Sequence, residues 1–332
     1  MRKDMKHVCI VSGDHLWLNP RVVKEADALA KAGFRVTVVG PTLTKHERAR
    51  DQTILATRNW RRIAAPDLLK GGPSAPKRFL ARLFRRLSII AVTRLRLQMA
   101  GSLGYGIAQT LRATVAVNAD IYSCHLEVGL LVLRRLTHMG RPCAFDFEDW
   151  YSRDLRPEAQ RSKPMALLAK LERQAMNEAE FTTTTSSALA AALVAAYGGT
   201  KPLVVFNAFE KDEGPLAESG SPDRRLKTRP SLHWYSLNIG RGRGLELLFD
   251  AVELLKHDFE LHVRGEGSAD YKNELLQRLS PKTRERVFFH PTVDPAQLRV
   301  RIAEHDIGFA LEASTPPSRD LTITNKVFQY LQ

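Results

Sequence analysis

The first forty residues alternate short apolar runs with one amphipathic stretch. Residues 7–12 (HVCIVS) are apolar, rich in β-branched side chains and followed by a glycine, which is typical of a buried parallel strand. Asn19 and Pro20 then predict a helix start, because the Asn side chain can cap the helix and proline is tolerated in its first turn. Apolar residues recur on one helical face up to Gly33, and residues 34–40 (FRVTVVG) predict a second strand. This order predicts one right-handed βαβ unit.

The same alternation returns twice along the chain. A first series predicts strands in DIYSC, PCAFDFE, FTTTTS and LVVFNA with helices between them, and a second series runs from LHWYSL to IGFALE. We therefore expect two Rossmann-like α/β domains, each with an open parallel sheet, facing a cleft: residues 1–212 and 231–332. Residues 213–230 are rich in Gly, Pro, Ser and charge, so they predict the linker. A last helix begins in residues 324–332 without a cap or a returning strand, so we expect the second domain to be incomplete.

Composition limits the classes of partner. Of 332 residues, 44% are hydrophobic and 26% charged, which is a globular composition. The net charge of +14 favours an anionic partner: a phosphate, a lipid headgroup or a nucleic acid. We find no RNP, KH or zinc-finger pattern, so we expect no nucleic-acid partner. Cys9, Cys124 and Cys143 lie far apart in apolar runs without metal-ligand spacing, which predicts buried, inert thiols.

A basic amphipathic segment covers residues 76–99. The N-terminal apolar run is too short for a signal peptide, and no stretch of about 18 apolar residues exists, so we expect a cytoplasmic protein. The segment predicts a helix that docks on an anionic membrane surface, on the inner face of the cytoplasmic membrane. The alternative is a helix packed on the first domain with its arginines in water. The expected docking residues are Arg78, Phe79, Arg82, Phe84, Arg85 and Arg86.

A glycine-rich turn joins a predicted strand to a predicted helix in the second domain. It reads GRGRG: Gly240, Gly242 and Gly244 allow backbone N–H groups to approach a ligand closely, and Arg241 and Arg243 add cationic forks. The following helix directs its positive end to the same point, which suits a phosphate. The alternative is an ordinary strand-to-helix turn with solvated arginines. The spacing is not the GxGxxG of dinucleotide-binding proteins.

Two further features belong to the same predicted phosphate site. Gly265 and Gly267 predict a second tight strand-to-helix turn. Asn325 and Lys326 stand together at the start of the last helix, where backbone donors and a positive charge could hold phosphate. A simple helix cap with a solvated lysine is the alternative.

The motifs in this order resemble those of the family 4 group of glycosyltransferases, which have the GT-B fold. The likeness in the first domain lies in NPRVVKEADALAKAGFRVTVVG, DIYSCHLEVGL, CAFDFEDWYSRD and EFTTTTSSALAAAL, and in the second in SLNIGRGRGLELLFDAV, HVRGEGS and NKVFQYLQ. It covers nearly the whole chain. It implies a nucleotide-sugar donor, transfer with retention of anomeric configuration and no metal or other cofactor.

The resemblance also implies roles for individual residues. Gly13 and Arg21 are assigned to donor binding, and Arg243 takes the family's cationic position on the phosphates. Glu312 matches the first of two donor-site carboxylates, and Gln329 stands where the second is expected. An amide can still bond a ribose hydroxyl, although without a charge. Asn238 replaces the usual second arginine.

Acidic residues follow a predicted strand of the first domain. Asp146, Glu148 and Asp149 lie where open α/β sheets bind ligands, at the carboxyl edge of the strands, and His125 follows a neighbouring strand. A carboxylate there could accept a proton from an acceptor hydroxyl or bond the transferred sugar. A solvated acidic loop and a structural histidine are the alternatives.

Three functions remain open from the sequence. The leading one is transfer of a sugar from a nucleotide-sugar to a lipid-linked or polysaccharide acceptor in cell-envelope assembly. The second is a nucleotide-sugar epimerase of the non-hydrolysing type. The third is a non-catalytic nucleotide-sugar-binding protein, which Asn238 and Gln329 favour.

Overall fold

The computed structural model describes residues 5–69, 75–155, 157–209, 223–225, 228–311 and 316–331. By its contacts the chain divides into two compact units. The first is Met1–Phe206 with Pro316–Thr322, and the second is Asn207–Thr315 with Ile323–Gln332. Most of the expected linker, 213–230, lies outside the described residues. The short segment Pro316–Thr322, which we assigned to the second domain, packs within the first unit.

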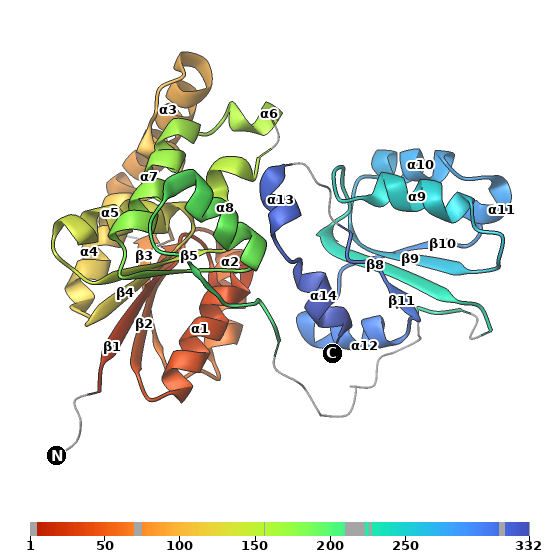
Figure 1. The fold of residues 1–332 in the computed structure, drawn as a ribbon, viewed down its shortest axis with the longest axis horizontal. Coiled ribbons are helices and arrows are strands. Elements are labelled where there is room, and N and C mark those ends of the chain that lie inside the picture. The colour runs from red at the N-terminus through yellow and green to blue at the C-terminus, as the bar shows by residue number, and fades with distance from the viewer. Residues whose placement is uncertain are drawn as a thin grey trace. The chain divides into compact units, whose positions relative to one another are not determined.

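A parallel sheet of seven strands forms the centre of the first unit (Figure 1). Its strand order is β3-β2-β1-β4-β5-β6-β7. Strands β2 and β3 are added on one side of β1 and strands β4 to β7 on the other, so the strand order reverses between β1 and β4. The strands are β1 (His7–Val11), β2 (Arg35–Thr42), β3 (Arg61–Asp67), β4 (Ile121–His125), β5 (Cys143–Phe147), β6 (Phe181–Thr184) and β7 (Leu203–Val204).

Helices cover both faces of this sheet. Side chains alternate along β1, so Val8 and Ile10 pack against one helical layer and Cys9 and Val11 against the other. The first layer is α1 (Pro20–Lys31) and α2 (Lys45–Leu55); the second includes α4 (Ile107–Val117), α5 (Leu126–His138), α7 (Met165–Glu178) and α8 (Ser187–Tyr197). The remaining elements are η1 (Leu16–Leu18), α3 (Ala75–Leu95), η3 (Ala100–Ser102), η4 (Tyr151–Arg153), α6 (Pro157–Gln160) and α13 (Pro317–Leu321).

The predicted signals at the ends of α1 are confirmed. Asn19 Oδ1 accepts from the backbone N–H of Val22 at 3.3 Å, and Pro20 is the first helical residue. Gly33 has φ +88° and follows the helix directly, a conformation that glycine adopts without the steric cost of a Cβ. The helix is therefore fixed at both ends by local sequence.

The second unit contains a smaller parallel sheet in the order β10-β9-β8-β11. One of its faces is apolar: Leu232, Trp234, Leu261 and Val263 pack against α9 and α10. The elements are β8 (Ser231–Asn238), α9 (Leu245–Glu253), β9 (Glu260–Glu266), α10 (Ala269–Gln277), α11 (Pro281–Arg284), β10 (Val287–His290), α12 (Pro295–Ala303), β11 (Ile307–Gly308) and α14 (Asn325–Tyr330).

The opposite face of this smaller sheet is polar and buried, which the sequence pattern did not predict. Ser231, His233, Glu260, His262 and Arg264 are each at most 2% exposed. This face is therefore covered in the fold, although its side chains are polar.

Two other expectations concern the whole chain. All three cysteines are free and buried, as predicted, and burial raises the pKa of the Cys9 and Cys143 thiols to about 12. Within the described residues, no helix is both long and apolar enough to cross a membrane.

Candidate functional site

The carboxyl edge of the first sheet brings distant polar residues together at the strand-order reversal. Gly13 follows β1, and His125 ends the adjacent β4. A Cβ on Gly13 would lie 3.0 Å from the Leu126 Cβ, so only glycine lets these two turns pack so closely. This is where open α/β sheets bind ligands.

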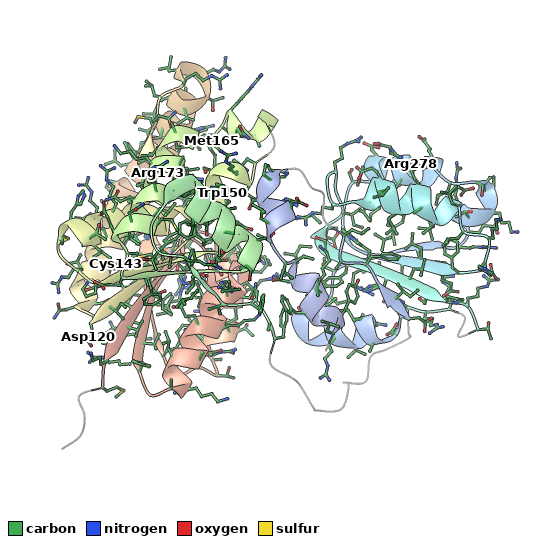
Figure 2. All side chains as sticks on the ribbon, in the orientation of Figure 1. Asp120, Cys143, Trp150, Met165, Arg173 and Arg278 are labelled. Atoms are coloured by element: carbon green, nitrogen blue, oxygen red, sulfur yellow. The ribbon has the colours of Figure 1, made fainter. Side chains whose placement is uncertain are left out.

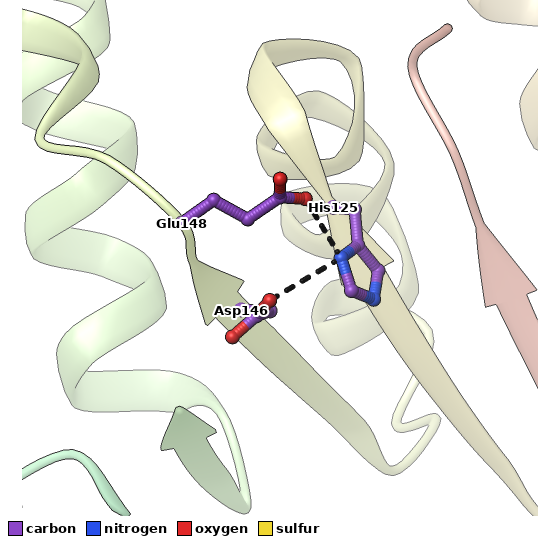
Figure 3. Close-up of side chains that lie close together, drawn as sticks. All are labelled: His125, Asp146 and Glu148. Carbon is purple, nitrogen blue, oxygen red and sulfur yellow. Dashed lines mark hydrogen bonds and ion pairs between the residues drawn. The ribbon is translucent and has the colours of Figure 1, made fainter. Parts of the chain in front are cut away.

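His125 is fully buried, with carboxylates near both ring nitrogens. Figure 3 shows the two on the Nδ1 side, Asp146 and Glu148. The Nε2 of His125 donates to Glu25 of α1 at 2.6 Å, and its Nδ1 lies 3.1 Å from Glu148 and 3.5 Å from Asp146. Burial lowers the pKa of His125, but the charges and hydrogen bonds of Glu25, Glu148 and Asp146 outweigh it and hold the pKa well above its usual range. The ring is an imidazolium with both N–H groups engaged, so it is poorly suited to act as a general base.

Asp146 and Arg21 form a buried ion pair beside this ring. The Arg21 guanidinium donates through Nε and Nη2 to the two oxygens of Asp146, and its Nη1 donates to the Val205 carbonyl at 2.9 Å. Thr183 adds another donor to Asp146. Burial raises the pKa of Asp146, but Arg21 and His125 lower it by more, so Asp146 is a carboxylate. Arg21, expected to bind the donor, lies in this cluster.

Two carboxylates lie close to Nδ1 of His125, and Glu148 is the more accessible of the two. Its side chain is 17% exposed, against 4% for Asp146. Asn19 Nδ2 donates to Glu148 Oε1 at 2.8 Å, so the same asparagine that caps α1 also orients the carboxylate. Glu148 Oε2 has no hydrogen bond to another described residue. Asp149 stands apart: burial, with Asp154 and Glu148 nearby, raises its pKa to about 7.

This cluster has the residue types of a metal site but is already neutralised. His125, Asp146 and Glu148 each have a possible ligand atom within 4.8 Å of the others. The Arg21 fork, however, takes both oxygens of Asp146. With a guanidinium and an imidazolium beside its carboxylates, the cluster suits hydrogen bonding to sugar hydroxyls better than cation binding.

The glycine-rich turn predicted between a strand and a helix of the second unit is present, between β8 and α9. Gly242 and Gly244 both have φ +76°, and Gly244 is the N-cap of α9. The two arginines differ: Arg241 is 62% exposed in its side chain and paired with Glu274 of α10, whereas Arg243 has no hydrogen bond or ion pair to another described residue. Arg243 is therefore the cation in this turn that is available to a phosphate. Gly240 has open space on its Cβ side.

Gly265 and Gly267 have a packing role. Gly265 has φ +151°, and a Cβ there would lie 2.5 Å from the Ser236 carbonyl oxygen. At Gly267 a Cβ would lie 2.8 Å from Ile239. These glycines let the turn after β9 pack against the end of β8.

The remaining donor-site candidates are held by contacts within the second unit. Asn325 Oδ1 accepts from Asn207 at 2.7 Å, and Gln329 Oε1 accepts from the Tyr235 hydroxyl. Lys326 is 6% exposed, with its Nζ 5.6 Å from the Trp234 ring centroid. Glu312 lies outside the described residues.

Sequence reasoning missed Glu25 and Thr183. Glu25 lies 100 residues before its partner His125, and Thr183 lies 37 residues after Asp146. Glu25 stands on the polar side of an amphipathic helix, where a carboxylate is ordinary. Only the strand order places it beside His125.

Comparisons with known proteins agree on the fold. No family model and no curated protein matches the sequence. Among solved structures, a glycosyltransferase from Rickettsia africae ESF-5 is 13% identical, covers 92% of this chain and 72% of its own, and has a TM-score of 0.57. HepE from Anabaena, in complex with UDP and glucose, is 17% identical over 91% and 73%, with a TM-score of 0.58. Sucrose-phosphate synthase from Thermosynechococcus elongatus is 13% identical over 91% and 74%, with a TM-score of 0.57.

The chain has the GT-B fold. The expected class, α/β with two Rossmann-like parallel-sheet domains, is confirmed. In GT-B terms, the carboxylate cluster belongs to the N-terminal Rossmann-like unit and the glycine turn to the C-terminal one. At these identities the likeness concerns the fold, so activity has to be argued from the residues.

Proposed function

We propose that the protein is a glycosyltransferase that moves a sugar from a nucleoside diphosphate donor to a hydroxyl of an acceptor, with retention of configuration. The observation that carries this proposal is Arg243: a GT-B chain has an arginine without a carboxylate partner among the described residues, in a glycine turn at the N-terminus of α9. Such a turn suits a diphosphate, because backbone donors, the helix dipole and a guanidinium meet there. HepE, with the same fold, was solved with UDP and glucose.

The reaction needs charge stabilisation more than covalent chemistry. The bond from the anomeric carbon to the diphosphate oxygen breaks, and the acceptor oxygen bonds to that carbon. The diphosphate then carries an additional negative charge, which Arg243 and the α9 N-terminus would stabilise. The hydroxyl proton must go to a base. Glu148 is our candidate, because it follows the carboxyl end of β5, is more exposed than Asp146 and has one oxygen without a described partner.

Family 4 membership, absence of a metal requirement and cytoplasmic location belong to the same proposal. The motif resemblance supports the first two. The sugar and the base of the donor are left open.

We also propose that the acceptor is lipid-linked and that α3 docks the first unit on an anionic membrane surface. Much of the apolar side of α3 is exposed: Phe79 is 65% exposed and Leu80 59%, whereas Phe84, at 57%, also packs on Gly101 of η3. Arg78 and Arg82 donate to the Leu68 carbonyl, at 3.3 and 3.5 Å. These arginines attach the helix to the unit, which leaves much of its apolar side uncovered.

Charge near the apolar side favours a membrane as its occupant. Arg85 also turns inward, to the Ser102 carbonyl and over the Tyr105 ring. Arg86 is exposed beside the apolar residues and has no partner among the described residues. The proposed membrane contact therefore consists of apolar side chains with Arg86 at their border, and the net charge of +14 favours anionic lipid.

Product analysis tests the function. The protein is incubated with radiolabelled nucleotide-sugars and an extract of cell-envelope lipids, and the label is followed by chromatography. We expect label in an acceptor fraction together with free nucleoside diphosphate. An epimerised free nucleotide-sugar without transfer would instead support the epimerase, and no turnover of any donor would contradict both enzymes.

A further inference from the structure

A cavity of about 530 Å³ lies within the first unit, beside the segment that follows Glu148. Its size is typical of small-molecule sites. All the residues that line it belong to the first unit, so it does not depend on how the two units are placed. They come from η4, α6, α7, α8 and α13 and include Ser152, Arg153, Arg173 and Tyr197.

Two arginines of the cavity wall lie on two aromatic rings that contact each other. The Arg153 guanidinium carbon is 5.1 Å from the Trp150 ring centroid, and that of Arg173 is 5.3 Å from the Tyr197 ring centroid. The two rings meet edge to face, with centroids 6.0 Å apart. Figure 2 shows Trp150 and Arg173 in this part of the first unit. Aromatic rings attract guanidinium groups and limit the positions they adopt.

The positive charge of this wall is not balanced by its own residues. None of the described residues that line the cavity is acidic. Among the described residues, Arg153 has no carboxylate partner. Arg173 donates to the carbonyls of Ala196 and Tyr197, which accept hydrogen bonds without cancelling the charge. The described lining therefore carries two guanidinium groups and no carboxylate.

A buried hydrogen-bond network holds the rings in place. Trp150 Nε1 donates to the Tyr197 hydroxyl at 2.9 Å, and this hydroxyl donates to Glu172 at 2.8 Å. Ser152 N–H donates to the other oxygen of Glu172 at 3.0 Å. Glu172 is fully buried, and burial raises its pKa to about 6. A fixed network of this kind pre-organises the arginines that rest on it.

We infer that this cavity binds an anionic group of the acceptor, namely a phosphate ester or a carboxylate carried on a sugar. Two guanidinium groups suit both anions, and Ser152 and Gln160 add polar groups to the wall. Met165 and Pro317 supply apolar surface for the sugar carbons. The inference rests on the proposed transferase function.

Chain length links the cavity to the proposed base. Arg153 is five residues after Glu148, so their Cα atoms are at most roughly 18 Å apart. An acceptor with its anion at Arg153 therefore needs to extend over no more than a few sugar units to bring a hydroxyl to Glu148.

Calorimetric titration of the full chain tests this site without any nucleotide. The probes are glucose 6-phosphate, glucuronate, inorganic phosphate and, as the neutral comparison, glucose. We expect at least one anionic sugar to bind at least tenfold more tightly than glucose. We also expect Arg153→Ala and Arg173→Gln to weaken this binding about tenfold or more. Arg161→Ala is the matched control, because Arg161 is exposed on the same unit but does not line the cavity.

The phosphate and carboxylate probes decide which anion the acceptor carries. Thermal melting of each variant checks that the fold is kept, and Arg153→Ala alone suffices if Arg173→Gln unfolds the end of α8. Binding of both anionic sugars no tighter than glucose, or unaffected by either substitution, would overturn the inference. Tight nucleoside diphosphate binding in the same preparation would show that the proposed function survives this failure.

Discussion

Arg21 and Asp146 form an ion pair in the interior of the first unit. Both side chains are at most 9% exposed, and each depends on the other for its charge to be tolerated. We expect Asp146→Ala to lower the free energy of unfolding by about 3–5 kcal/mol, because it leaves the Arg21 guanidinium buried without its carboxylate. Equilibrium urea denaturation measures this. The double variant Arg21→Met/Asp146→Leu should recover most of the loss, and a double variant as unstable as the single one would argue against this explanation.

Glu148 gives a second prediction at this scale. We expect Glu148→Gln to reduce transfer about 10²- to 10⁴-fold, the usual effect of losing a general base, with little change in donor binding. Initial rates at saturating donor measure the loss. Glu180→Gln, at an exposed carboxylate in the turn between α7 and β6, is the control and should keep the activity of the wild type. Equal rates in Glu148→Gln and the control would remove Glu148 as the base.

The sequence predicted individual site residues better than their partners. It identified His125, Asp146 and Glu148 because each stands at the end of a recognisable strand. It did not identify Glu25, and it singled out Arg243 over Arg241 only through the family resemblance, without the pairing of Arg241. Both distinctions depend on side chains from another helix, Glu25 on α1 and Glu274 on α10, whose positions follow from packing and not from local pattern.

Among the elements, α3 carries the proposal of membrane docking. We expect Phe79→Ser/Leu80→Ser to reduce binding to phosphatidylglycerol-containing vesicles at least roughly tenfold, because each side chain loses its transfer into the bilayer. Vesicle co-sedimentation measures this. Met139→Ser, at a similarly exposed apolar residue elsewhere on the unit, should bind as the wild type does. Equal binding by all three proteins would leave α3 without a membrane role.

The polar face of the smaller sheet makes the second unit sensitive to acid. His233 and His305 stack with ring centroids 4.3 Å apart, and the Nε2 of each is buried without a hydrogen-bond partner among the described residues. Burial lowers the pKa of His305 to about 3 and that of His233 well below its usual range. Folding thus favours the neutral rings, so their stabilisation is complete above about pH 6.5 and is lost as the pH falls toward 3.

Thermal melting between pH 7.5 and pH 5 checks this dependence. We expect the melting temperature of the second unit to fall with pH, and to fall less in His305→Phe, which cannot take up the proton. The comparison with wild type at each pH removes the contribution of other titrating groups. An identical pH dependence in the variant would show that His305 does not govern it.

The elements that the pattern missed have identifiable physical reasons. β3 (RRIAAPD) has a proline and two arginines, so it does not read as a strand, yet it pairs with β2 at the edge of the sheet, where proline is tolerated. α2 (KHERARDQTIL) has almost no apolar side, and it is held instead through buried Asp51, which pairs with His15 and Arg62. Apolar periodicity predicts elements that bury an apolar face. The strand β3 and the helix α2 are held mainly by polar contacts instead.

At the scale of the whole molecule, the two α/β units of the GT-B fold have different proposed roles. The first unit carries the carboxylate cluster, the anionic cavity and α3, and the second carries the glycine turn. The alternation of strands and helices made this architecture predictable. The inclusion of Pro316–Thr322 in the first unit was not, because it depends on contacts such as Ser318 Oγ accepting from the Trp150 N–H.

Nucleotide binding tests the central claim most directly. Calorimetric titration with UDP, GDP and ADP should reveal binding of at least one nucleoside diphosphate, and Arg243→Ala should weaken it about 10- to 100-fold, the usual effect of losing a charge-assisted contact. Arg241→Ala, in the same turn but paired with Glu274, should bind nearly as the wild type does. No binding of any of the three nucleotides, or equal affinity in wild type and Arg243→Ala, would contradict the account.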